Sequence, residues 1–258
     1  MKLYGMEDTP KYLTTNPYIK TGFRKCTSLP DSVLSIFYFH KDSMDTYTSI
    51  LSFSTGIILF FLGIYMFGTL EHMKTRIIFG LFFLHILIHS PPSILTHWIG
   101  CSGYSERLHM ILLKLDCQCI FIASLILSVI FSLCIFSNNV AFIYSLSCAV
   151  ICIYLCLNIH KIFYNHYLRL YSTMGMVFFY LFPLFYYCVT NYNSFASDIV
   201  ISIFLFLFLA GIIYNFHFPE CYFPKIFNYF GSHSIMHILI NIAQILEFIF
   251  LLYITKLL

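Results

Sequence analysis

Beyond its first 46 residues, the chain is built from long apolar stretches that are separated by short polar breaks. A helix needs about 20 apolar residues to cross a bilayer core of about 30 Å, and seven stretches come close to this length. They predict membrane-spanning helices over residues 47–68, 75–98, 108–136, 140–159, 171–189, 197–215 and 233–254. The predicted fold class is therefore an all-α integral membrane protein with seven transmembrane helices.

Turn-forming residues and prolines refine this pattern. Asn138 and Asn139 separate the third predicted span from the fourth, as expected for polar loop residues. Pro91, Pro92 and Pro183 fall inside predicted spans, where neighbouring helices can satisfy the carbonyl groups that a proline frees. We expect these prolines to kink helices rather than to end them.

The first 46 residues differ in character, because they hold 11 of the 25 Asp, Glu, Lys and Arg residues of the chain. Several apolar side chains lie between Pro30 and His40, and Asp31 or Ser32 is available as a helix cap. This pattern predicts a short helix in the membrane interface. We therefore expect a cytosolic N-terminal segment, residues 1–46, and a transmembrane domain, residues 47–258.

Charge indicates the orientation of the chain and excludes one class of partner. Eleven Lys and Arg residues lie on the N-terminal side of the predicted spans and three lie on the other side. The positive-inside rule then places the N-terminus in the cytosol and the C-terminus outside it. The net charge is only +3, and the Lys and Arg residues form no basic stripe along the sequence. No nucleic-acid partner is therefore expected.

The ten cysteines are not expected to form structural disulfides, because those in loops face the reducing cytosol in this topology. Cys148, Cys152 and Cys156 lie on one face of the fourth predicted span. Small residues are common at helix contacts in membranes. We therefore favour packing over metal binding for this stripe.

Ionisable side chains inside predicted spans are few, and their cost in a membrane makes each a functional candidate. His233 and His237 lie four residues apart, so both imidazoles project from one helix face and can bind one metal ion. The predicted topology places His97 and Asp116 at the same depth as this pair. Three imidazoles and an oxygen, with one position open to water or substrate, are typical of a catalytic zinc site.

Other buried groups fit this site less well. An ideal helix drifts by about 40° every four residues, so His85 lies about 120° around its helix from His97. We expect His85 and His89 to be hydrogen-bonded or to line a cavity, rather than to form a second metal site. Glu247 lies about 15 Å beyond His237 along the last span, and the sequence assigns it no role.

Several spaced motifs carry a resemblance to a known family. They comprise residues 16–24, the stretch from Ser35 to His40, Ser93 with His97, Glu106 ten residues before Asp116, and Pro219-Glu220 followed by Ser232-His233 and His237. Together they resemble the progestin and adipoQ receptors and the related haemolysin III proteins, from about residue 16 to the end of the seventh span. The resemblance implies a zinc ion held by His97, His233 and His237, with Asp116 as a carboxylate near the metal.

The chain departs from the motifs of this family at a few positions, which are Cys117, Cys221, Asp45 and the pair Thr48-Ser49. These departures leave the three histidines in place. They bear instead on the identity of the substrate and of any external ligand.

The zinc site suggests a chemistry for the chain. Asp116 can accept a proton from water and later deliver it to a leaving amine, while zinc polarises the carbonyl. Ser93, one turn before His97, is a second catalytic candidate, and bonding to its own helix backbone is an equal alternative. The family resemblance implies a lipid amide such as ceramide as substrate.

Two other functions stay open at this point. The chain can be a signalling receptor in which the zinc is structural, or a membrane-homeostasis protein without turnover. Membrane lipids are the expected partners in each case, and the sequence names no protein partner. Product formation by the purified protein separates the hydrolase from both alternatives.

Overall fold

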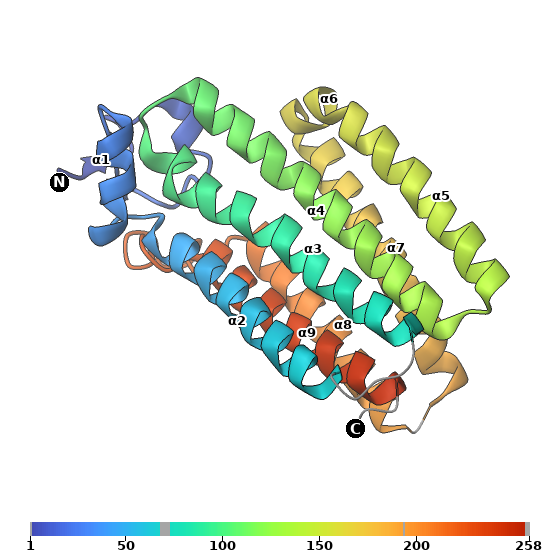
Figure 1. The fold of residues 1–258 in the computed structure, drawn as a ribbon. Coiled ribbons are helices and arrows are strands. Elements are labelled where there is room, and N and C mark those ends of the chain that lie inside the picture. Colours follow the sequence, from blue (N-terminus) through green and yellow to red (C-terminus); the bar gives the residue numbers. More distant parts are fainter. Residues whose placement is uncertain (1, 68–72, 193, 256–258) are drawn as a thin grey trace. The chain divides into compact units, whose positions relative to one another are not determined.

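A computed structural model describes residues 2–67, 73–192 and 194–255. Seven of its helices are long and apolar enough to cross a membrane. These helices, shown in Figure 1, are α2 Ser43–Phe67, α3 Met73–Trp98, α4 Glu106–Ile135, α5 Asn138–Leu157, α7 His166–Thr190, α8 Phe195–Asn215 and α9 Ser232–Ile254. All seven predicted spans are confirmed, and residue 68 at the end of the first lies outside the described residues.

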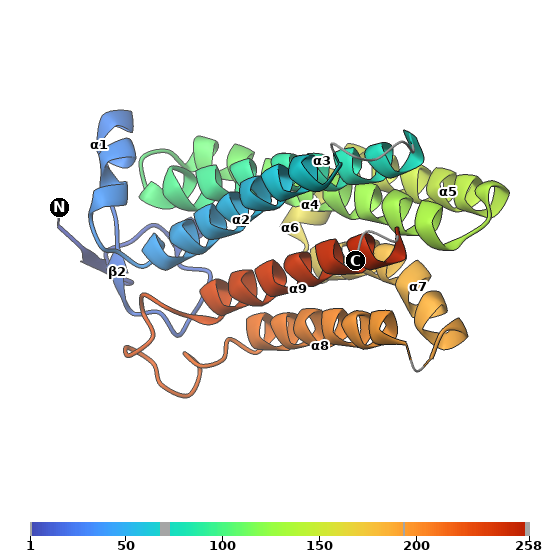
Figure 2. The same ribbon diagram turned by 60° about the horizontal axis from the view of Figure 1, so that its bottom comes forward.

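Shorter elements complete the chain. They are β1 Tyr4–Gly5, η1 Lys11–Leu13, β2 Thr21–Phe23, α1 Leu29–Leu34, η2 Ser35–Phe37, η3 Gly100–Ser102 and α6 Ile159–Tyr164. β1 and β2 pair antiparallel. Figure 2 shows β2 and α1 close to the first turns of α2. The prolines at 91, 92 and 183 lie inside α3 and α7, which continue through them as expected.

α1 confirms the short helix that was predicted before the first span, but its cap differs from the prediction. Ser28, rather than Asp31 or Ser32, is the N-cap, and its side chain accepts a hydrogen bond of 3.2 Å from the backbone N–H of Asp31. Pro30 explains the earlier start, because a proline fits the first turn of a helix, where its missing N–H costs nothing. Asp31 therefore lies in the first turn and not before it.

The chain forms two compact units. The first comprises Met1–Ser52, Ser90–Leu115 and Phe206–Ile242, and the second comprises Phe53–His89, Asp116–Leu205 and Ala243–Leu258. The first unit therefore gathers the N-terminal segment, the first turns of α2, α4 and α9, and the last turns of α3 and α8. These are the helix ends that the sequence places on one side of the membrane.

The second unit has an aromatic and aliphatic core. Phe131 is fully buried and contacts Phe250, with ring centroids 6.0 Å apart. At Gly56, a Cβ atom would lie 2.4 Å from a side-chain carbon of Ile86, so the glycine allows α2 and α3 to approach closely. Cys152 packs in a buried cluster with Phe121, and this contact agrees with the packing role expected for the cysteine stripe.

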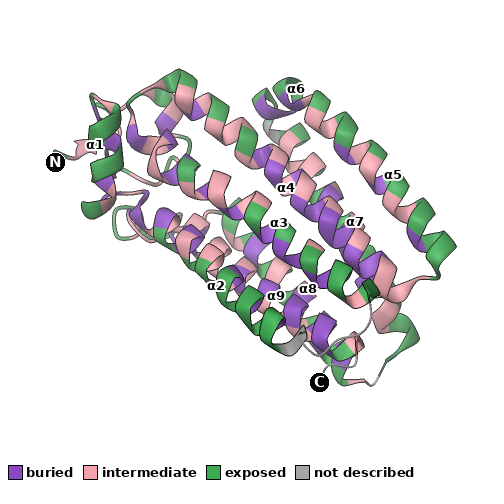
Figure 3. Cartoon of the chain, viewed as in Figure 1, coloured by how far each residue is buried: buried purple, intermediate pink, exposed green. Residues whose placement is uncertain are grey.

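Many apolar side chains of the long helices are exposed, and Figure 3 shows how much of α5 is exposed. Its buried residues are Ala141, Cys148 and Cys152, whereas Phe142 and Leu157 are 68% and 77% exposed. In water such a surface would promote association, but it matches the solvent properties of lipid tails. The chain is thus an integral, multi-pass membrane protein, and all ten of its cysteines are free.

Candidate metal centre

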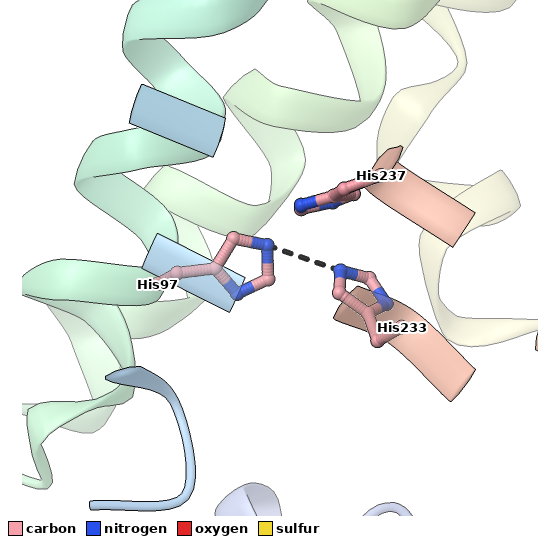
Figure 4. A group of neighbouring side chains, drawn as sticks. All are labelled: His97, His233 and His237. Carbon is pink, nitrogen blue, oxygen red and sulfur yellow. Dashed lines mark hydrogen bonds between the residues drawn. The ribbon is translucent and has the colours of Figure 1, made fainter. Parts of the chain in front are cut away.

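Three histidines of the first unit converge on one point. His97 lies near the end of α3, and His233 and His237 lie one turn apart at the start of α9, as Figure 4 shows. One ligand nitrogen from each ring lies within 4.8 Å of the others. Within residues 2–67, 73–192 and 194–255, this is the only group of three or more potential ligand side chains with such spacing.

The donor atoms fit a tetrahedral ion. The Nε2 atoms of His97 and His233 lie 3.1 Å apart. Zinc–nitrogen bonds of about 2.0–2.1 Å at tetrahedral angles separate two ligand nitrogens by about 3.4 Å. A small shift of either ring would therefore let both atoms bind one ion, and the three imidazoles would leave a fourth position for water or substrate.

Two hydroxyl groups on α2 lie against one ring nitrogen of His237. The Oγ1 of Thr48 and the Oγ of Ser49 each lie 3.1 Å from Nδ1 of His237. Both hydroxyls donate their own protons to backbone carbonyls, of Met44 at 2.8 Å and of Asp45 at 2.8 Å. With their protons on these carbonyls, the hydroxyls can accept from an Nδ1–H group of His237, a tautomer that would leave Nε2 as the nitrogen that can bind a metal.

Ser93 belongs to the same hydroxyl network. It is buried on α3, and its Oγ lies 3.3 Å from the Oγ of Ser49. Its contact in the structure is therefore with a residue that orients His237. This places Ser93 behind a ligand of the candidate metal centre.

A buried arginine fixes the end of α3. The guanidinium group of Arg24 donates to the carbonyl oxygens of His97 at 2.8 Å and of Trp98 at 2.9 Å. Trp98 is the last residue of α3, so these are carbonyls that have no partner within the helix. A cation at this position also interacts favourably with the helix dipole. Arg24 therefore holds the turn that carries His97.

Arg24 is balanced by a buried carboxylate just before α2. Asp42 accepts from Lys41 Nζ at 2.7 Å and lies 3.5 Å from Arg24. Burial alone would raise the pKa of Asp42, but Lys41 and Arg24 outweigh it and bring this pKa to about 2. The backbone N–H of Asp42 donates to Nδ1 of His40 at 3.2 Å, and burial together with Arg24 lowers the pKa of His40 to about 3. His40 is therefore neutral at physiological pH.

A second carboxylate anchors the start of α9, one residue before His233. Glu220 is buried, and it accepts hydrogen bonds from the backbone N–H of Ser232 at 2.8 Å and from its hydroxyl at 2.5 Å. The side chain of Asn16 donates to the same carboxylate at 2.9 Å. Because the first N–H groups of a helix have no partner within it, Glu220 stabilises this helix end and fixes its direction.

Asp45 connects the first turns of α2 and α9. Its Oδ1 accepts a hydrogen bond of 2.5 Å from the hydroxyl of Ser234. Ser234 lies between the two metal-binding candidates of α9. Thus the three residue positions at which the chain departs from the family motifs in this region, Asp45, Thr48 and Ser49, all contact the start of α9.

Comparison with known proteins adds the family. The family model of haemolysin-III-related proteins matches residues 37–248. The chain belongs to this family. A similar protein is Heptahelical transmembrane protein 3 of Arabidopsis thaliana, which is 30% identical over 105 residues. That match covers 39% of this chain and 30% of the relative.

Other predicted residues of this haemolysin-III-related protein lie in the second unit. Asp116 is on α4, and its Oδ1 is buried without a hydrogen-bond partner among the described residues. His85 is buried against Phe82, with ring centroids 4.8 Å apart. Glu247 is also buried, on α9. The roles assigned to Asp116 stay predictions, and the group of neighbouring ligand atoms consists of the three histidines alone.

The sequence did not reveal what supports the three histidines of this family member. Arg24, Asn16 and Glu220 were recognised as parts of motifs, but their roles depend on contacts with residues up to 204 positions away. The available signal was their chemistry, since a polar or charged side chain that becomes buried needs a hydrogen-bond partner. The hydroxyls of Thr48 and Ser49 gave no comparable signal.

Proposed function

We propose that this chain binds one zinc ion through His97, His233 and His237 and uses it to hydrolyse the amide bond of a membrane lipid such as ceramide. The observation that carries the proposal is the convergence of the three imidazoles, with two Nε2 atoms 3.1 Å apart. Three-histidine sets with an open fourth position are typical of catalytic rather than structural zinc.

The surrounding residues support such a centre. Thr48 and Ser49 lie within hydrogen-bond distance of Nδ1 of His237, where they can favour the tautomer that binds metal, and Arg24 holds the carbonyl of His97. A bound zinc ion would supply an activated water and polarise a carbonyl group. We assign Asp116 the role of accepting a proton from the attacking water and returning it to the leaving amine. Its unpartnered Oδ1 is consistent with a carboxylate that acts on a substrate.

The substrate class follows from two considerations. The histidines lie on membrane-spanning helices, so the molecules that reach them most readily are lipids. Among lipids, the motifs shared with progestin and adipoQ receptors suggest that the substrate is a lipid amide. Hydrolysis of a ceramide would yield a fatty acid and a sphingoid base.

The test is hydrolysis of ceramide by the purified protein in lipid nanodiscs, with zinc measured on the same samples. We expect the wild type to release sphingoid base, and His237→Ala to lose both zinc and product. Asp116→Asn is expected to keep zinc and to lose activity by about 10²–10⁴-fold, the usual contribution of general acid–base catalysis.

His89→Ala is the matched control, because it removes a histidine from the same helix, two turns before His97. It should keep both zinc and activity. Full zinc and full hydrolysis in His237→Ala would contradict the proposed site. A wild type that holds zinc but forms no product would contradict the hydrolase function and favour a receptor with structural zinc.

A further inference from the structure

The consecutive helices α1 and η2 bury polar side chains and expose apolar ones, the reverse of a helix on a water-exposed surface. Ser32 and Ser35 are fully buried, whereas Leu34 and Phe37 are 55% and 81% exposed. The polar side is satisfied within the protein, since Ser32 Oγ lies 2.8 Å from Ser102 Oγ, and Ser35 Oγ accepts from Arg24 at 2.5 Å. An apolar side that faces outward is suited to contact with lipid.

A groove opens beside this apolar side. It has a volume of about 430 Å³ and is lined by Val33, Ile36, Phe37, Tyr47 and Trp98. This volume falls in the range of small-ligand pockets. The groove therefore has room for part of a lipid molecule.

The polar atoms of its aromatic residues already have partners. The hydroxyl of Tyr47 donates to the carbonyl of Ile36 at 2.8 Å, and the indole N–H of Trp98 donates to the carbonyl of Val33 at 3.0 Å. These bonds also attach α1 and η2 to the first turns of α2 and to the end of α3. What remains in the groove is apolar surface, so a hydrocarbon chain fits it better than a polar ligand.

Its position indicates the source of that hydrocarbon. Tyr47 and Trp98 lie at the ends of two membrane-spanning helices, the usual position of aromatic residues at a membrane interface. One turn further along α2, the apolar side chain of Leu51 is 49% exposed, so exposed apolar surface continues along α2 beyond Tyr47. We propose that the groove holds one acyl chain of a membrane phospholipid, with α1 and η2 lying in the bilayer interface.

This lipid site goes beyond the proposed hydrolysis and needs no zinc. It has a built-in reporter, because Trp98 is the only tryptophan of the chain. We would measure its fluorescence in nanodiscs that contain increasing fractions of a phospholipid brominated on its acyl chains, since bromine quenches tryptophan on contact. One bound chain predicts quenching that rises linearly with the brominated fraction. Bromine near the headgroup should quench more strongly than bromine near the chain end.

Val33→Phe and Leu34→Phe form a matched pair. Both add an aromatic ring to α1 and keep it apolar, but only Val33 lines the groove. We expect Val33→Phe to lose most of the quenching and Leu34→Phe to retain it, with circular dichroism confirming that both variants are folded. Equal quenching in the two variants, or no quenching in the wild type, would overturn the proposal.

Discussion

The guanidinium group of Arg24 donates a hydrogen bond of 2.8 Å to the main-chain carbonyl of His97. A cation from the N-terminal segment is therefore fixed to the residue that supplies the α3 ligand of the candidate metal centre. The same side chain reaches Trp98 and lies beside Asp42. The N-terminal segment is thus part of the support of the metal centre.

Replacing Arg24 by lysine tests this support. Lysine keeps the charge but cannot present a planar fork to two carbonyls, so the end of α3 should become less well fixed. We expect zinc affinity to fall by about 10–100-fold, the range for loss of a residue that orients a metal ligand. Competition with a chelator measures it. Lys25→Arg, at an exposed neighbouring position, should bind zinc like the wild type, and unchanged affinity in Arg24→Lys would refute the supporting role.

Removing the hydroxyls behind His237 should also weaken zinc binding. In the double variant Thr48→Val, Ser49→Ala, Nδ1 of His237 loses both acceptors, so the metal-binding tautomer is no longer favoured. We expect affinity to fall by about 10–100-fold. Thr46→Val is the control, because Thr46 is buried on the same helix and donates to the carbonyl of Asp42 instead. If the double variant and the control bind zinc equally, the tautomer argument is wrong.

Glu220→Gln tests the anchor of α9. An amide can present only one oxygen to donors that now bond both carboxylate oxygens, so a buried donor loses its partner. Such a loss costs about 1–3 kcal/mol, and the melting temperature in detergent should fall. Glu7→Gln makes the same change at an exposed position and should melt like the wild type. Equal melting temperatures of the two variants would show that the anchor contributes little.

Acid should destabilise the protein partly through His40. Burial, together with Arg24, lowers the pKa of His40 from 6.5 to about 3. Between these values the unfolded chain takes up a proton that the folded chain does not, so stability falls as the pH decreases from 6.5 towards 3. The contribution is at most about 1.4 kcal/mol per pH unit.

In His40→Asn, stability should depend less steeply on pH over this range, because asparagine can accept the same backbone hydrogen bond without titrating. Melting temperatures of metal-free wild type and variant, recorded from pH 6.5 downward, give the comparison. The metal is removed from both samples so that its acid-induced release does not contribute. Parallel curves would contradict the assignment.

The spans were predictable because each depends on local composition. α8 begins at Phe195 and was predicted from residue 197, and α9 begins at Ser232 and was predicted from residue 233. The cap of α1 at Ser28 was missed, since Asp31 and Ser32 have equally good capping side chains. Only Pro30, which favours a helix whose first turn includes it, indicates that the cap lies at Ser28. α6, between the fourth and fifth spans, was not predicted, because six residues are too few for a periodic pattern.

The three histidines were also predictable, from their spacing and from the alternation of helix directions. Their supports were not, because the partner of Arg24 is the backbone of a residue 73 positions away and no side-chain pattern marks a carbonyl group. The polar contacts of Ser93 likewise emerged only from the packing of α2 against α3. The orientation of the chain across the membrane stays a prediction from its Lys and Arg distribution.

The most direct test of the central claim is the metal content of the detergent-purified protein, measured by mass spectrometry. The wild type is compared with the double variant His233→Ala, His237→Ala and with the control His89→Ala. We predict about one zinc per chain in the wild type and in the control. The double variant should contain almost none. A folded wild type without zinc, or a double variant that retains it, would contradict the account.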